Sequence, residues 1–197
     1  TFAAGEKPPA AFRIGMEHEK FGLLGDDLRP LPYSGPRSIE AIFGIMVDRF
    51  GFQRFKEGDD TIALVKDGTS ISLEPGCQLE LSGAVLRDNF QTCRELTEHR
   101  DLVHVIGDEL DITWLGVGHT PFAKLDDFEW PPKERYRIMR RYLPTRGARA
   151  LDMMVRTGTV QSNFDYADEA DMADKMRTAI AVTSIVSAIY ANSAIVE

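Results

Sequence analysis

The sequence predicts an α+β fold with a mainly antiparallel sheet flanked by helices, and three observations support this class. The 197 residues are 43% hydrophobic and 27% charged, which suffices for a sizeable buried core. Residues 61–66 and 70–73 flank an Asp67-Gly68 turn, a pattern typical of a β-hairpin. Strands and helices then follow one another without an internal repeat, which favours α+β over a regular βαβ fold.

The first half of the chain is expected to be mostly strand. An arm at 1–11 should precede a long strand at 12–24, which ends at the Gly25-Asp26-Asp27 turn. A helix is expected at 38–50 because Ser38 can cap it, apolar residues recur at helical spacing, and Gly51 can close it. The hairpin comes next, and a further strand is expected at 77–81 after the Pro75-Gly76 break.

The second half is expected to be mostly helical. A helix is predicted at 89–110 on the spacing of its apolar residues, another at 135–142 that ends before Pro144, and a last one from Asp168 onward. A short buried strand is expected at 114–117, and a loop at 123–132. Within 152–164, the β-branched residues around Thr157 and Val160 favour a strand in the second part.

Composition excludes several classes of protein. The formal net charge is −8, which disfavours non-specific nucleic-acid binding. The chain contains no run of 18 apolar residues, so neither a membrane span nor a membrane partner is expected. The first residues lack a signal pattern, and a cytoplasmic location is therefore expected. The chain starts at Thr1 and ends at Glu197 directly after a helical stretch, so we expect a fragment of a longer protein.

Two acidic segments could carry chemistry. On a strand, Glu17 and Glu19 point to the same face, and such a carboxylate pair suits Mg²⁺; a solvated strand face explains the pattern equally simply. Gln78 and Glu80 likewise share one face of their strand, between the bends at Pro75-Gly76 and Gly83, although an ordinary amphipathic strand would read the same way. Cys77 lies in the first of these bends, where its thiol is either reactive or buried.

Two further segments could bind anions or polar ligands. Four arginines lie within residues 135–141, and guanidinium groups bind carboxylates and phosphates; a solvated helix face is the alternative. Thr157, Thr159, Gln161 and Asn163 would line one face of a strand, where they could recognise a ligand such as an amino acid or simply face solvent.

These segments and several others occur along the chain in a characteristic order and spacing. The segments are Gly15–Phe21, the stretch from Leu73 to Gly83, Gln91-Thr92-Cys93, Arg135–Arg140, the stretch from Asp152 to Asn163, Glu169–Met172 and Ala191-Asn192-Ser193. They resemble glutamate–cysteine ligases of the plant and proteobacterial type from about residue 12 to residue 193. Cys77 departs from the family pattern, which usually has glycine there, and Arg141 stands where asparagine is usual. Members of the family also continue well past Ser193.

The resemblance implies a glutamine-synthetase-like active-site sheet and an ATP-dependent carboxylate–amine ligase. The family joins the γ-carboxylate of glutamate to the amine of cysteine through a γ-glutamyl phosphate, the first step of glutathione synthesis. Residues 12–197 would form the N-terminal portion of the catalytic domain. A ligase that uses another acceptor amine, and a glutamate- or nucleotide-binding module without turnover, remain alternatives. The expected small-molecule partners are glutamate, cysteine and ATP, with Mg²⁺ as cofactor, and the oligomeric state stays open.

The resemblance also implies roles for particular residues. The expected magnesium ligands are Glu17, Glu19, Glu74 and Glu80, and the expected nucleotide contacts are Gln78 and Glu80. The expected substrate contacts are Arg140, Met153, Met154, Arg156, Thr157, Thr159, Gln161 and Asn163. The arginines would bind substrate carboxylates, the methionines would contact the cysteine side chain, and the remaining residues would hold polar substrate atoms. Glu17, Glu19 and Arg156 are the expected catalytic residues.

Overall fold

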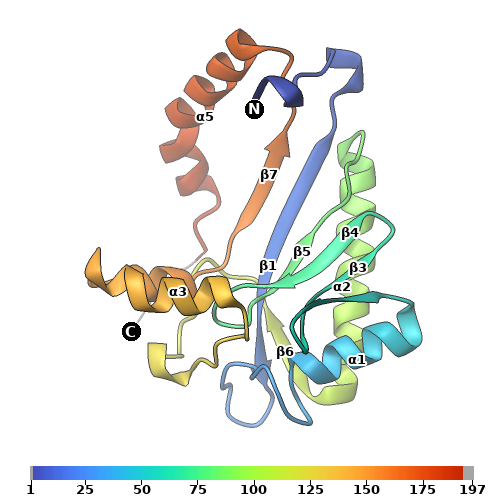
Figure 1. Ribbon diagram of the computed structural model, residues 1–197, viewed down its shortest axis with the longest axis vertical. Helices are drawn as coiled ribbons and strands as arrows, with labels where there is room; N and C mark the ends of the chain where they lie inside the picture. Colours follow the sequence, from blue (N-terminus) through green and yellow to red (C-terminus); the bar gives the residue numbers. More distant parts are fainter. Residues whose placement is uncertain (1, 193–197) are drawn as a thin grey trace.

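The computed structural model describes residues 2–192, so the Ser193 of the last quoted motif lies outside the described residues. A seven-stranded sheet has helices on both of its faces, and every strand pairing is antiparallel (Figure 1). This confirms the α+β class with a mainly antiparallel sheet.

One long strand organises the sheet. The strands are β1 (Ile14–Leu24), β2 (Gln53–Glu57), β3 (Asp60–Lys66), β4 (Thr69–Leu73), β5 (Leu79–Ser82), β6 (Ile112–Leu115) and β7 (Val160–Phe164). Their order is β2-β3-β4-β5-β1-β6, and β7 also pairs with β1. Glu17 on β1 lies between Ser82 on β5 and Gln161 on β7, so β5 and β7 occupy the two edges of β1 at this point.

The helices begin and end largely where their capping residues predict. They are α1 (Ile39–Phe50), α2 (Asn89–Leu110), α3 (Glu134–Tyr142), α4 (Ala150–Arg156) and α5 (Glu169–Ile189). The side chains of Ser38, Asp88 and Asp168 each accept a hydrogen bond from a backbone N–H in the first turn of α1, α2 and α5. Gly51 ends α1 with a φ of 74°, a conformation that glycine adopts without strain.

The side chains of β1 alternate between two hydrophobic cores. Met16 faces a core built from α1, α2 and the apolar faces of β4 and β5. Phe21, an odd number of residues away, faces a second core that contains Phe128, Tyr136 and Val155 from the α3–α4 side. Because Glu17 and Glu19 share the parity of Phe21, they lie on the face covered by α3 and α4 rather than on the face covered by α1 and α2.

Several predicted boundaries are wrong. β2 was not expected, because all five of its residues are exposed and carry no alternation of burial. The strand expected at 114–117 is β6, which begins at Ile112, and the one expected from residue 77 begins at Leu79 because Cys77 has a φ of 60°. The segment 152–164 is divided: its first part belongs to α4, and only its second part is a strand. The loop expected at 123–132 contains a short 3₁₀ helix, Leu125–Asp127.

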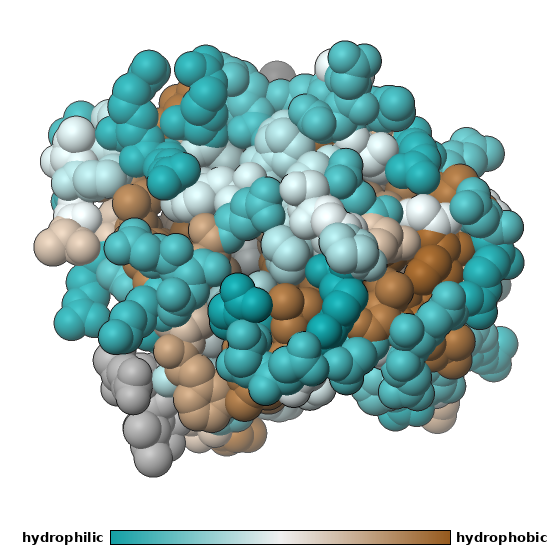
Figure 2. All heavy atoms as spheres, turned by 90° about the horizontal axis from the view of Figure 1, so that it is seen from below, coloured by the Kyte–Doolittle hydropathy of each residue, from teal (hydrophilic) through white to brown (hydrophobic). Residues whose placement is uncertain are grey.

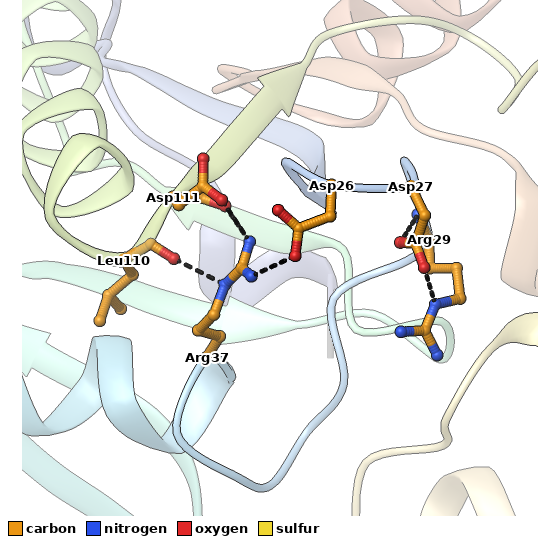
Figure 3. A network of polar contacts seen from close by, with 6 residues as sticks. All are labelled: Asp26, Asp27, Arg29, Arg37, Leu110 and Asp111. Atoms are coloured by element: carbon orange, nitrogen blue, oxygen red, sulfur yellow. Dashed lines mark hydrogen bonds and ion pairs between the residues drawn. The ribbon is translucent and has the colours of Figure 1, made fainter.

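Arg37 holds together two chain segments that are far apart in sequence (Figure 3). Its guanidinium donates to the carbonyl oxygens of Leu110 and Asp111 and to the carboxylates of Asp26 and Asp111. The loop before α1 is thereby fixed to the junction between α2 and β6.

None of the helices in residues 2–192 is long and apolar enough to span a membrane.

Candidate active site

Three carboxylates form a compact group on the α3–α4 face of the sheet. Glu19 on β1 is paired directly with Glu80 on β5, and Glu17 lies two residues from Glu19 on the same face. Directly opposed residues of an antiparallel pair have their Cβ atoms about 4.5–5.5 Å apart. The register therefore forces like charges into proximity, which is unfavourable unless something compensates for the repulsion.

Side chains of β7 and of Thr159, directly before it, hold the two β1 carboxylates. Glu17 accepts hydrogen bonds from the side-chain amides of Gln161 at 3.1 Å and Asn163 at 3.0 Å. Glu19 accepts from both the backbone N–H and the hydroxyl of Thr159, at 3.0 and 2.8 Å. Three of the four residues of the predicted polar row are thus brought beside the acidic pair, and all three are exposed. Burial of Glu19 raises its pKa, an effect that Glu80 and Glu17 increase and that the Thr159 bonds oppose.

Glu80 and Glu74 complete the acidic group. Glu80 accepts hydrogen bonds from the hydroxyls of Ser72 and Ser82, at 2.9 and 2.8 Å. Glu74, at the end of β4, is half-buried beside Glu80 and Glu19. Burial, together with these negative neighbours, raises the pKa of Glu74 to about 7. The acidic group is therefore electrostatically strained in the absence of a cation.

The donor chemistry of this group fits Mg²⁺. Carboxylate oxygens are hard ligands, and magnesium is commonly held by one or two carboxylates together with substrate phosphates and water. Within residues 2–192, however, no three His, Cys, Asp or Glu side chains already surround a common point. Glu17, Glu19 and Glu80 are instead turned toward their hydrogen-bond donors. A bound cation would therefore take a subset of these carboxylates and would need oxygen ligands from elsewhere.

Two residues that sequence reasoning missed lie against Glu74. The hydroxyl of Tyr136 on α3 donates to Leu73 O and lies 3.4 Å from Glu74 Oε1, and Lys133 Nζ donates to Leu73 O at 2.7 Å. Burial lowers the pKa of Lys133, while Glu74 and Glu80 act in the opposite direction. Tyr136 belongs to a motif quoted above, so its presence could have been noted. Lys133 follows two prolines in a segment without periodicity, and no pattern marks it.

The side chain of Gln78 forms several hydrogen bonds with the C-terminal end of α4. Its side-chain amide donates to the carbonyl oxygens of Met154, Val155 and Thr157 at 2.8–3.3 Å, and its oxygen accepts from Gly76 N–H at 2.8 Å. The side chain is 1% exposed. These bonds satisfy carbonyls at the C-terminal end of α4 that have no partner inside the helix. Gln78 thus connects β5 to the helix that carries the predicted substrate contacts.

The arginines predicted to bind substrate lie in different surroundings. Arg156 is buried at the end of α4 and pairs with Asp152 at 3.0 Å, one turn earlier. Arg140 is exposed on α3, where its guanidinium lies 5.1 Å from the centre of the Trp130 ring. It lines a cavity of about 500 Å³ together with Lys133 and Tyr136. Arg140 therefore shares a cavity with Lys133 and Tyr136, the two residues that lie against Glu74.

Thr157, Met153 and Met154 are not part of the polar row. The hydroxyl of Thr157 donates to the carbonyl oxygen of Met153 and so caps the end of α4 instead of joining Thr159 and Gln161. Met153 is 57% exposed, whereas Met154 is packed in the second core. Of the two methionines, only Met153 presents its side chain to solvent.

The other face of the sheet carries a separate buried polar group. Lys20 Nζ lies 2.8 Å from His99 Nε2 on α2, and burial lowers the pKa of Lys20 to about 7. A cavity of about 790 Å³ between α2 and the β3–β4 hairpin reaches His99. Because Lys20 has the opposite parity to Glu19, neither feature opens onto the acidic group.

Comparison with known proteins gives consistent matches. Residues 13–197 match the family described as Glutamate-cysteine ligase family 2. Glutamate–cysteine ligase A, chloroplastic, of Oryza sativa subsp. japonica is 46% identical over 190 residues, which are 96% of this chain and 38% of the relative. The chloroplastic glutamate–cysteine ligase of Arabidopsis thaliana is 44% identical over 195 residues, 99% of this chain and 37% of the relative.

The comparison corrects one expectation and limits another. Relatives from rice, Arabidopsis thaliana and Solanum lycopersicum are all named as chloroplastic, so the expectation of a cytoplasmic location is wrong. A missing signal pattern at the first residue of this chain was therefore a poor guide to location. The chain spans less than two fifths of the length of these relatives.

Proposed function

This chain belongs to glutamate-cysteine ligase family 2, and we propose that it supplies the acidic face of the active site of an ATP-dependent ligase. The reaction joins the γ-carboxylate of L-glutamate to the amine of L-cysteine, the first step of glutathione synthesis. The γ-carboxylate first attacks the terminal phosphorus of ATP, which gives γ-glutamyl phosphate and ADP. The amine of cysteine then attacks the acyl carbon, phosphate leaves, and the amine loses a proton.

The observation that carries this proposal is the direct pairing of Glu19 with Glu80, with Glu17 and Glu74 beside them. Phosphoryl transfer between anions needs cations more than it needs covalent help from the protein. Mg²⁺ bound by a subset of these carboxylates would neutralise the phosphates and orient them. The half-buried position of Glu74 supports this role, because a carboxylate with so high a pKa gains most from a nearby cation.

We assign the polar row to the amino-acid substrate. Thr159, Gln161 and Asn163 fix the two β1 carboxylates, and their remaining hydrogen-bonding capacity would meet polar atoms of glutamate. Arg156 is assigned to a substrate carboxylate, since Asp152 holds its guanidinium in one orientation from within α4. We further assign Arg140 to an anionic group in the cavity that it shares with Lys133, and Met153 to the side chain of cysteine.

Gln78 and Met154 receive positioning roles in this proposal. The amide of Gln78 is committed to three carbonyls of the α4 end, so it would act on substrate through the placement of Arg156 and Thr157. Met154 would support the same helix from the core. Glu80 remains the residue of this strand that we assign to the cation and the nucleotide phosphates.

The test is ADP release from ATP in the presence of Mg²⁺ and glutamate, measured with and without cysteine. It would use the chain as given and an extended chain, in which residues 1–197 are continued by the part of the Arabidopsis thaliana relative C-terminal to its aligned segment. We expect cysteine-dependent ADP release from the extended chain. Release that responds to a different amine but not to cysteine would overturn the assigned acceptor. Glutamate binding without any release would overturn the ligase and favour a binding module.

A further inference from the structure

Helix α5 differs from the other helices in that none of its residues is buried. From Ile180 to Ile189 it carries large apolar side chains that remain open to solvent, with Ile180, Ile185 and Ile189 59–69% exposed. At 100° per residue, the four branched apolar residues from Val182 to Ile189 form one stripe about 100° wide, and Ile180 lies on the opposite side of the helix. Figure 1 shows the helix standing apart from the sheet, beside β7.

Apolar exposure elsewhere has a different character. The end of the molecule seen from below also shows brown apolar side chains at its surface, interrupted by hydrophilic ones (Figure 2). Scattered exposure of this kind is normal for a folded protein. An apolar stripe on a helix of a globular protein normally packs against the rest of the fold. No residue of the α5 stripe is buried, so the stripe has no covering partner among the described residues 2–192.

Both ends of α5 are nevertheless fixed to the rest of the molecule. Near its start, Lys175 donates to Asp165 O at 2.9 Å, pairs with Asp171 at 2.6 Å, and lies 4.2 Å from the centre of the Phe12 ring. Beyond its end, the side chain of Asn192 accepts from Gly118 N–H at 2.9 Å. Because α5 is held at both ends, its apolar side chains are already in place. A partner that binds them therefore loses little free energy in ordering the helix.

We propose that α5 is the surface against which the rest of the ligase polypeptide packs, the part that lies outside the span of this chain. The relatives supply the reason for this occupant: the aligned segment accounts for only 37–38% of their length. The occupant would present apolar side chains around residues 180–189 of α5. This inference rests on family membership and on the exposure of α5, so it stands or falls independently of the proposed reaction.

The test compares the accessibility of α5 in the chain as given and in the extended chain. Ile185→Cys would be introduced in both, and its rate of reaction with a maleimide would be measured. We expect the rate to fall at least about tenfold in the extended chain, because buried thiols are inert. Two native cysteines act as controls: exposed Cys93 reports that the reagent is active on the chain as given, and buried Cys77 must stay unreactive if the fold is intact.

Two outcomes would overturn the proposal. Equal reactivity of Ile185→Cys in both chains, with Cys77 still protected, would mean that α5 remains open in the longer protein. Protection in the chain as given that grows with protein concentration would mean that a second copy covers α5. A second variant tests the energetics: Ile185→Asp should lower the melting temperature of the extended chain and leave that of the chain as given nearly unchanged. Arg177→Asp, in the charged first half of α5, is the matched control and should have little effect in either chain.

Discussion

Glu19 is the residue on which the proposed cation site depends most, because it is paired with Glu80 and lies next to Glu17 and Glu74. Replacing it with glutamine removes one charge and keeps one oxygen, which can accept one of the two Thr159 bonds. We expect Glu19→Gln to slow ADP release by the extended chain about 100-fold or more, since a cation on the phosphates contributes several kcal/mol. Glu98→Gln, on the exposed surface of α2, is the control. A wild-type rate for Glu19→Gln would remove this residue from the site.

The raised pKa of Glu74 predicts that the stability of the folded chain depends on pH. An unfolded glutamate ionises near 4.5, whereas the folded-state pKa of Glu74 is about 7. Between these values the folded state holds the extra proton, so stability should fall as pH rises from about 4.5 to about 7. Glu74→Gln lacks this ionisation. In metal-free buffer, the melting temperature of Glu74→Gln relative to the unchanged chain should therefore increase across this window, and a constant difference would contradict the assigned burial.

Cys77 has a φ of 60°, a left-handed conformation that costs a residue with a side chain about 1–2 kcal/mol. At an ordinary position alanine is more stable than glycine by about 0.4–1 kcal/mol. At position 77 we expect the reverse order, with Cys77→Gly at least as stable as Cys77→Ala in urea unfolding. Both variants lose the thiol and its 3.3 Å contact with Glu129 O, so this loss cancels in the comparison. An ordinary order would show that the left-handed backbone is not retained.

At the scale of elements, Arg37 offers a comparison within one small region (Figure 3). Its guanidinium makes three hydrogen bonds to Leu110 and Asp111 at the end of α2 and one to Asp26 in the turn after β1, and its side chain is only 30% exposed. Arg37→Ala should therefore lower the free energy of unfolding by about 1–3 kcal/mol. Arg29 pairs with Asp27, two residues away, in an exposed position. Arg29→Ala should cost less than about 0.5 kcal/mol, and equal losses would mean that the Arg37 bonds are worth no more than an exposed pair.

Elements with local signals were predictable, and those that depend on distant partners were not. α2 was predicted with its observed bounds, because the spacing of its apolar residues is a local signal. β2 has five exposed residues and exists through its pairing with β3. α4 has seven residues, too few to be stable alone, and it depends on Gln78 and on the burial of Val155.

The same distinction applies to the candidate site. That Glu17 and Glu19 share a face follows from the two-residue period of a strand. That Glu19 faces Glu80, 61 residues later, follows only from the register of β1 and β5. The approach of Tyr136 and Lys133 to Glu74 requires the packing of α3 on the sheet, which no local pattern contains.

At the scale of the whole molecule, Gln78 connects the two sides of the sheet. Its neighbours on β5, Leu79 and Leu81, lie in the core formed with α1 and α2. Its own amide reaches the carbonyls of Met154 and Val155, which lie in the core formed with α3. The end of α4, and with it Arg156, is thereby placed relative to the acidic face. These hydrogen bonds fix the position of the proposed substrate contacts relative to the sheet.

Gln78→Leu tests this link, because leucine has a similar size and cannot donate. The carbonyl oxygens of Met154, Val155 and Thr157 would lose their buried donor, and we expect the free energy of unfolding to fall by about 2–4 kcal/mol. Gln91→Leu, on the exposed start of α2, is the matched control and should cost less than about 1 kcal/mol. In the extended chain, Gln78→Leu should also raise the KM for glutamate, because Arg156 is no longer fixed. A destabilised variant with unchanged KM would limit Gln78 to folding and would separate Arg156 from glutamate binding.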